Sequence, residues 1–97
     1  MAVTVLLEAQ TQDGQTDGLL DFLKQILPDT RNYEGYLDIN VIQDQDNPNT
    51  IVLVEKWETK SHYEKYLQWR TENGDIDKLG SFLTGPPSIR FFNRKDA

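Results

Sequence analysis

The sequence predicts an α+β fold in which two helices cover one face of a single four-stranded antiparallel sheet. Four segments have the residue pattern of strands and two have apolar residues at helical spacing. Their order along the chain is strand, helix, strand, strand, helix, strand, which is the split βαβ order of the ferredoxin-like fold. A chain of 97 residues has room for one core, so we expect a single domain over residues 1–97, with 93–97 as a frayed tail.

The first strand and the first helix are predicted from the period of their apolar residues. Residues 3–10 alternate with a period of two, and the apolar positions are Val3, Val5, Leu7 and Ala9. After a turn-forming segment, one helical face carries Leu19, Leu20, Leu23, Ile26 and Leu27. We expect Thr16 or Asp17 to cap this helix and Pro28 to end or bend it, because proline removes a helical hydrogen bond.

A hairpin and a second helix follow. Residues 36–42 and 50–57 have strand patterns, and they flank a segment of Asp, Asn and Pro residues that favours a turn. Thr59 or Ser61 then offers an N-cap, with Glu64 in capping-box register with Ser61, for a helix that runs to about residues 73–74.

The chain ends in a short helix and a last strand. Asp75 is predicted to cap a short helical segment that packs Ile76 and Leu79 inward and ends before the sequence Gly85-Pro86-Pro87. Residues 89–92 then form the last strand.

The predicted sheet is apolar on both faces. In the third strand Ile51 and Leu53 point one way while Val52 and Val54 point the other, and the outer strands repeat this pattern. Two short helices cover only one face, and a monomer rarely leaves several hundred Å² of such surface in water. We therefore expect a homodimer through the sheet face.

Composition excludes several classes of function. A net charge of −6 disfavours nucleic acid and anionic membranes as partners. The absence of cysteine excludes a thiolate nucleophile, thiolate metal ligands and disulfides, and fits a reducing compartment. We recognise no signal peptide and no run of about 20 apolar residues. A cytoplasmic protein is therefore expected.

Four segments together resemble the antibiotic biosynthesis monooxygenase domain family, and the resemblance spans nearly the whole chain. They are Asn32–Leu37 with a glycine that opens the second strand, the hairpin Asp44–Asn49, Val54–Thr59 with its Glu-x-Trp, and Leu83–Pro87 with its Gly-Pro. The resemblance implies a dimeric α+β barrel. The characterised enzymes of that family oxygenate quinols or polyketide phenols without metal or flavin, while relatives degrade haem or isomerise small molecules.

Glu55 and Trp57 match the family's Glu-x-Trp and lie on one face of the third strand. The resemblance places both beside a cavity between sheet and helices, where Glu55 is a candidate base and Trp57 a candidate substrate contact. A carboxylate in an apolar strand must otherwise be paired or exposed, and a tryptophan there also serves as a core anchor.

The second helix supplies the other candidates. The family often has a histidine nine residues after this tryptophan, where the present sequence has Tyr66, so Tyr66 is a candidate catalytic residue or a packed ring. The further substrate-binding candidates, which are also core candidates, are Tyr63, Trp69 and Phe82. His62, the only histidine, is expected to be exposed in the first turn, with no role assigned. The haem-degrading relatives use an asparagine on the first strand. The first strand here has none, so the resemblance disfavours haem degradation.

We predict neither a cofactor nor a metal. Asp44, Asp46 and Glu55 superficially resemble a calcium loop, but Pro48 and Asn49 stand where a ligand and the turn glycine belong. The leading hypothesis is a cofactor-independent monooxygenase acting on a quinol-like or small phenolic metabolite. An isomerase or a non-catalytic ligand-binding protein on the same scaffold is the first alternative. A module that joins other proteins through its sheet is the second.

Overall fold

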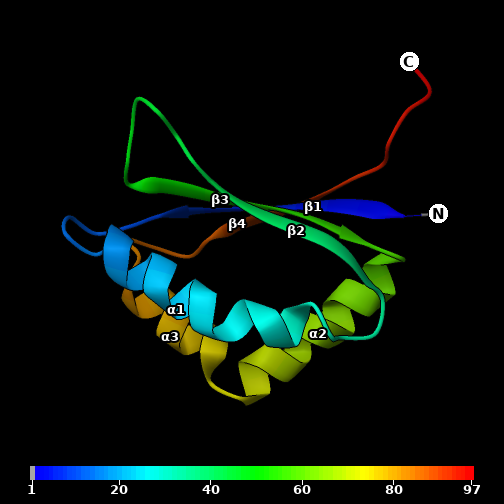
Figure 1. The fold of residues 1–97 in the computed structure, drawn as a ribbon, viewed down its shortest axis with the longest axis horizontal. Coiled ribbons are helices and arrows are strands. Elements are labelled where there is room, and N and C mark those ends of the chain that lie inside the picture. The colour runs from blue at the N-terminus through cyan, green and yellow to red at the C-terminus, as the bar shows by residue number, and fades with distance from the viewer. Residues whose placement is uncertain (1) are drawn as a thin grey trace.

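The computed structural model describes residues 2–97 and has the predicted ferredoxin-like architecture, with all helices on one side of an antiparallel sheet (Figure 1). The strand order is β2-β3-β1-β4, so the second and fourth strands form the edges. The elements are β1 (Val3–Gln10), α1 (Thr16–Thr30), β2 (Tyr36–Gln43), β3 (Thr50–Trp57), α2 (Lys60–Glu72), α3 (Asp75–Ser81) and β4 (Ser88–Phe92).

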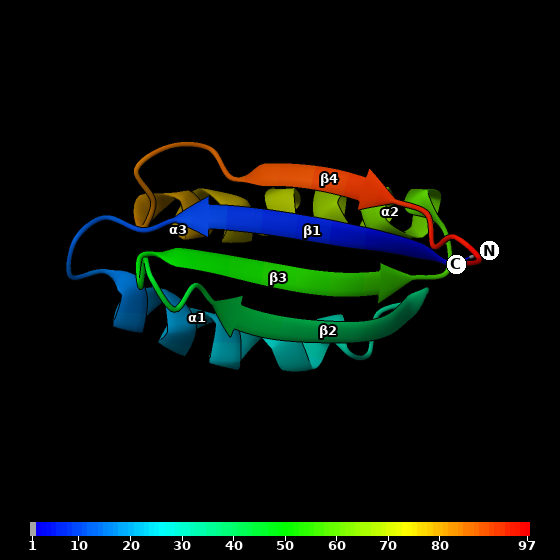
Figure 2. The ribbon, with the colours of Figure 1, turned by 90° about the horizontal axis from the view of Figure 1, so that it is seen from above.

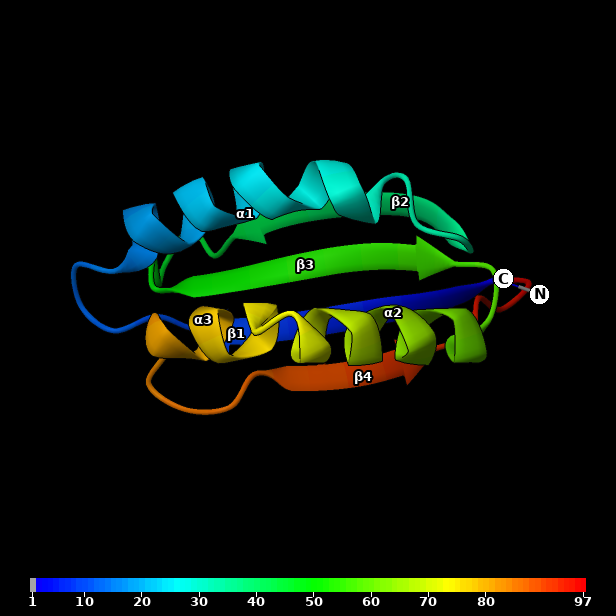
Figure 3. The same ribbon diagram turned by 90° about the horizontal axis from the view of Figure 1, so that it is seen from below.

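The helices form two rows on the covered face. Seen from the helix side, α1 runs along the β2 edge, while α2 and α3 follow one another along β1 and β4, with β3 between the rows (Figure 3). None of the helices within residues 2–97 combines the length and apolar character that a membrane crossing requires.

The first helix begins differently from the prediction. Its N-cap residue is Gln15, whose side chain makes no capping hydrogen bond, so the expected capping by Thr16 or Asp17 is wrong. The Thr16 hydroxyl instead lies 2.7 Å from the Thr11 hydroxyl, a bond that ties the helix to the end of β1. Pro28 lies inside the helix, which continues to Thr30.

The N-cap of α2 agrees with the prediction, and that of α3 differs from it. Thr59 is the N-cap of α2, and its hydroxyl accepts a 3.1 Å hydrogen bond from the His62 backbone N–H, so the first of the two predicted caps is confirmed. The N-cap of α3 is Gly74, with φ of 81°, and not Asp75. Asp75 is the first residue of α3, and its carboxylate binds Arg70 instead.

A close approach joins the start of β2 to the start of α2. Gly35 has φ of 89°, and a Cβ built there would lie 2.4 Å from Cγ of His62. The Glu58 N–H also donates a 2.8 Å hydrogen bond to the Gly35 carbonyl. Only glycine fits between these two segments.

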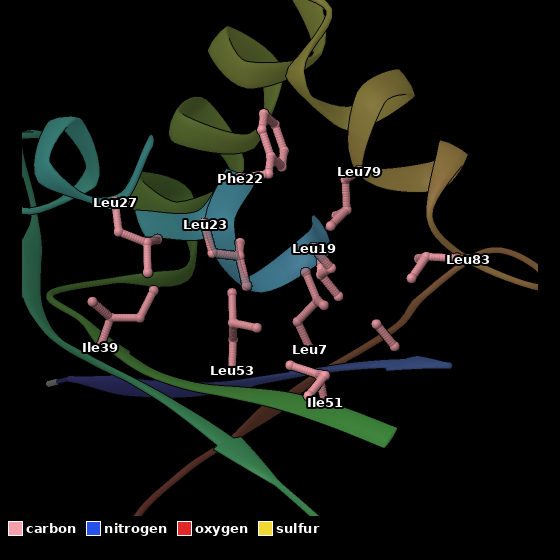
Figure 4. Close-up of a cluster of buried hydrophobic side chains, with 11 residues drawn as sticks. Leu7, Leu19, Phe22, Leu23, Leu27, Ile39, Ile51, Leu53, Leu79 and Leu83 are labelled. Carbon is pink, nitrogen blue, oxygen red and sulfur yellow. The ribbon is translucent and has the colours of Figure 1, made fainter. Parts of the chain in front are cut away.

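The core consists of two clusters of buried side chains. The larger joins α1 and α3 to the sheet, with Leu23 facing Leu53 and Leu27 facing Ile39 (Figure 4). The smaller surrounds Trp57 and contains Val3, Val5, Tyr63 and Tyr66.

The opposite face of the sheet is bare (Figure 2). Strand register places Val54 between Asn40 and Leu6, and Val52 between Ile42 and Glu8, so apolar side chains form its centre. At the β2 and β4 edges, Ile42 is 52% exposed and Phe92 40% exposed. The two-sided apolar sheet is thus confirmed, and its cover by a second subunit stays a prediction.

Candidate active site

A small cavity lies between the sheet and the helices. Its volume is about 40 Å³, and most of its lining is apolar. The polar and aromatic side chains that line it are Glu55, Tyr63, Tyr66, Arg70 and Asp75. The space holds one or a few water molecules, whereas pockets for small organic ligands usually measure roughly 300–1,000 Å³. A ligand of aromatic size therefore has to displace side chains to enter.

Glu55 is a buried carboxylate with no cationic partner. It is 2% exposed because it points inward from the middle of β3, where Val5 and Ile39 are its cross-strand neighbours. Within residues 2–97 no Lys, Arg or His lies within salt-bridge distance of it. Burial raises the pKa of Glu55 from 4.5 to about 7, and a hydrogen bond from Trp57 opposes this only in part.

Trp57 lies on the same face of β3 and holds that carboxylate. Its indole Nε1–H donates a 3.1 Å hydrogen bond to Oε1 of Glu55. The ring is fully buried, and its centroid lies 4.8 Å from that of Tyr66 and 5.7 Å from that of Tyr63. Trp57 is therefore both a core anchor and the group that orients Glu55.

The two tyrosines of α2 reach the same cavity. Burial raises the pKa of Tyr63, and the neighbouring Glu55 charge raises it further. Burial also raises the pKa of Tyr66, although hydrogen bonds with Thr30 and Arg70 work against it. Both phenols therefore keep their protons at neutral pH and can donate hydrogen bonds.

Arg70 fixes the Tyr66 hydroxyl through a buried network. The Tyr66 and Thr30 hydroxyls are 2.7 Å apart, and Arg70 donates to Tyr66 through Nε at 3.0 Å. The same guanidinium donates to the Ile26 carbonyl at 2.6 Å and to Asp75 at 2.8 Å. This arrangement ties α2 to both α1 and α3, and it holds the Tyr66 oxygen at the cavity wall.

Sequence reasoning missed Arg70 and Thr30 as members of the site. Arginine on a helix surface is usually solvated, yet Arg70 is 3% exposed and Thr30 fully buried. The available signal was the spacing of Tyr66 and Arg70, which are four residues apart and therefore neighbours on one helix face.

The remaining candidates lie farther from Glu55. Trp69 is half-buried and packs against Tyr33, with ring centroids 5.2 Å apart, so it borders the aromatic cluster without lining the cavity. Phe82 lies in the larger core cluster against Phe22, with ring centroids 5.9 Å apart, and does not line the cavity. These two residues are thus not brought to the site.

His62 is also separate from the site. Its ring Nδ1 lies 2.6 Å from the Thr59 hydroxyl, its Nε2 lies 3.8 Å from a Glu58 oxygen, and it is half-buried at the start of α2. Within residues 2–97 no three His, Cys, Asp or Glu side chains are grouped so as to hold a metal ion.

The geometry brings together one proton acceptor and two proton donors around an apolar space. A carboxylate with a pKa near 7 exchanges protons readily at neutral pH, and buried phenols stabilise negative charge on a nearby oxygen. The fold and the site thus define a ferredoxin-like domain with a buried carboxylate and two buried phenols at one internal cavity. The chain belongs to the antibiotic biosynthesis monooxygenase family, whose model matches residues 2–71.

Solved structures have the same fold. A conserved protein from Methanosarcina mazei Go1 matches with a TM-score of 0.89 and 19% identity, over 98% of this chain and 94% of that one. An antibiotic biosynthesis monooxygenase matches with a TM-score of 0.85 and 13% identity, over 97% and 99% of the two chains. A Mycobacterium tuberculosis protein matches with a TM-score of 0.81 and 17% identity, over 100% and 98%. The search of curated proteins found no match.

Proposed function

We propose that this protein is a cofactor-independent monooxygenase that acts on a quinol-like or small phenolic metabolite. The observation that carries the proposal is Glu55, a buried carboxylate whose pKa of about 7 suits a general base at neutral pH. Membership of the antibiotic biosynthesis monooxygenase family supports the class of reaction.

The substrate supplies all the electrons in this scheme. Glu55 takes the proton of a phenolic hydroxyl, and the phenolate transfers one electron to O₂. Recombination forms a carbon–oxygen bond at a hydrogen-bearing ring carbon ortho or para to that hydroxyl. Protonated Glu55 then gives its proton to the peroxide, and the resulting carboxylate removes a proton from that carbon. The O–O bond breaks, the carbon becomes a carbonyl, and the departing hydroxide takes the proton from Glu55. One phenol and one O₂ thus give one quinone and one water.

The neighbouring residues have supporting roles in the proposal. Trp57 holds Glu55 in place through the indole hydrogen bond. Tyr63 and Tyr66 donate to the developing charge on the substrate or peroxide oxygen, because burial keeps both phenols protonated. Trp69 and Phe82 are left outside this mechanism, since neither lines the cavity.

The proposed working form is a homodimer through the bare sheet face. Its centre is apolar, and Glu8, Asp38, Lys56 and Arg90 provide a charged rim at strand register positions of the same face. A face with an apolar centre and a polar rim is the usual composition of a stable interface. If purified protein sediments as a monomer at micromolar concentration, the alternative module that joins other proteins becomes the better reading.

One observation also favours the isomerase alternative. A carboxylate with a pKa near 7 moves a proton between two carbons of a substrate as readily as it starts an oxygenation. The two reactions differ in whether O₂ is consumed.

Oxygen uptake distinguishes them. Purified protein is mixed with menadiol or with a trihydroxynaphthalene, and enzyme-dependent O₂ consumption is recorded against a protein-free control. We expect one O₂ per product with the trihydroxynaphthalene, and one ¹⁸O atom in the product formed under ¹⁸O₂. Product formation without O₂ consumption would instead indicate the isomerase.

Two matched variants locate the base. Glu55→Gln removes the carboxylate and keeps the shape, and we expect kcat/KM to fall by roughly 10²–10⁴. Glu64→Gln makes the same change at an exposed position of α2 and should leave kcat/KM unchanged. Equal activity of the Glu55→Gln protein and the wild type would remove Glu55 from the mechanism.

A further inference from the structure

A second, open groove lies between α1 and the edge strand β2. Its volume is about 440 Å³, which is within the range of small-molecule sites. Figure 3 shows α1 running beside β2 on the helix side of the sheet, so a dimer formed through the other face would leave this side uncovered.

Only a thin wall separates this groove from the cavity at Glu55. Leu23, Leu27 and Ile39 line both spaces, and each is buried. In Figure 4, Leu27 of α1 lies opposite Ile39 of β2. An aromatic ligand that enters the cavity from the groove has to displace these three side chains, because the cavity alone is too small for it.

The groove has a charge opposite to that of the whole molecule. Lys24 and Arg31 line it and no acidic side chain does, although the chain carries a net charge of −6. Both cations are exposed, and within residues 2–97 no carboxylate lies within salt-bridge distance of either. They are seven positions apart, with Lys24 in α1 and Arg31 as its C-cap, which corresponds to about two helical turns, so both lie beside the groove about 10 Å apart.

We propose that the α1–β2 groove binds the carboxylate end of an aromatic hydroxy acid, whose ring enters the Glu55 cavity past Leu23, Leu27 and Ile39. Lys24 and Arg31 are then specificity-determining residues. The inference rests on the proposed function for the direction in which the ring points, and it narrows the substrate class from phenols to phenolic carboxylates.

Equilibrium binding tests this without turnover. The probes are 6-hydroxy-2-naphthoate, whose hydroxyl and carboxylate lie at opposite ends of the ring system, and its neutral amide of nearly the same shape. Binding is followed by calorimetry at low ionic strength. We expect the acid to bind at least about fivefold more tightly than the amide. This preference should shrink as salt is added, because the cations are exposed.

Charge-removing variants place the binding. Lys24→Gln and Arg31→Gln should each weaken binding of the acid by about two- to fivefold and leave binding of the amide unchanged. Lys65→Gln, the same charge change at an exposed position of α2, is the control and should alter neither ligand. An acid that binds no better than the amide, or an equal loss in all three variants, would overturn the proposal.

Access to the cavity has its own readout. Bound 6-hydroxy-2-naphthoate should change the titration of the Glu55 carboxyl, seen in its ¹³C NMR pH profile. Binding confined to the groove would leave that profile unchanged and overturn the access route. Oxygen uptake is measured separately. Charge-dependent binding without O₂ consumption would contradict the monooxygenase activity and support the carboxylate site. Oxygenation of neutral phenols with no preference for a carboxylate would support the activity and contradict the site.

Discussion

Replacing Glu55 by glutamine should stabilise the protein above neutral pH. The native state raises the pKa of Glu55 from 4.5 to about 7, so the folded chain keeps a proton that the unfolded chain has lost between these two values. The unfolded state therefore binds fewer protons in this window, and the free energy of unfolding falls as the pH rises from about 4.5 to about 7.

The size of the effect follows from the same two values. At about 1.4 kcal/mol per pH unit, the difference between 4.5 and about 7 corresponds to roughly 3 kcal/mol. Glutamine at position 55 has no such proton, and its carbonyl oxygen can still accept the hydrogen bond that Trp57 now gives to Oε1. The Glu55→Gln protein should thus gain about 3 kcal/mol over the wild type between acid and mildly alkaline pH.

Urea unfolding followed by tryptophan fluorescence measures this. Wild type, Glu55→Gln and the exposed control Glu64→Gln are compared at one protein concentration from pH 4.5 to 8, because the proposed dimer would make stability depend on concentration. The control should show a difference that is constant with pH. If the Glu55→Gln difference is also constant to within about 0.5 kcal/mol, the carboxylate does not hold its proton and the argument for a neutral-pH base fails.

Four further outcomes are expected. The kcat/KM of an oxygenated substrate should rise with pH and level off above about 7, as Glu55 loses its proton, and a profile flat from pH 5 to 9 would contradict this. Arg70→Met should lower the free energy of unfolding by about 3 kcal/mol in urea, because Asp75 and the Thr30 hydroxyl lose their donor. Tyr66→Phe should lower the free energy of unfolding by about 1–2 kcal/mol, and it should lower kcat more than it changes KM. Val54→Lys on the bare sheet face should yield a folded monomer by sedimentation and circular dichroism, and an unchanged sedimentation coefficient would place any dimer elsewhere.

The strands and helices were predictable because their signals are local. Alternation in residues 3–10 and helical spacing in residues 19–27 each need only a few neighbours to be recognised, and the structure has both elements. Helix N-caps were less predictable, because the hydroxyl of a threonine at a helix start can form a hydrogen bond with several different partners. Thr59 bonds its own helix, whereas Thr16 bonds Thr11, the residue that follows β1.

The site was predictable only in part. Glu55 was recognisable because strand parity and the Glu-x-Trp resemblance both point it inward. Trp57 shares its face and donates a hydrogen bond to it, but Trp57 does not line the cavity. Phe82 packs against Phe22 of α1 and does not line the cavity, and nothing in the local pattern of residues 75–83 reveals that contact. Arg70 was missed for the same reason, since its burial depends on Thr30 and Ile26, some forty positions earlier in the chain.

Gly35 has a consequence for how far this sequence can diverge. His62 occupies the volume that any side chain at position 35 would need, and the hydrogen bond from the Glu58 N–H to the Gly35 carbonyl ties the two segments together. Alanine there would force the first turn of α2 away from the sheet, directly beside the strand end that carries Trp57. The distance between α2 and the sheet at this point therefore depends on position 35 having a hydrogen in place of Cβ. A family member with a larger residue there must have a different backbone path between β2 and α2.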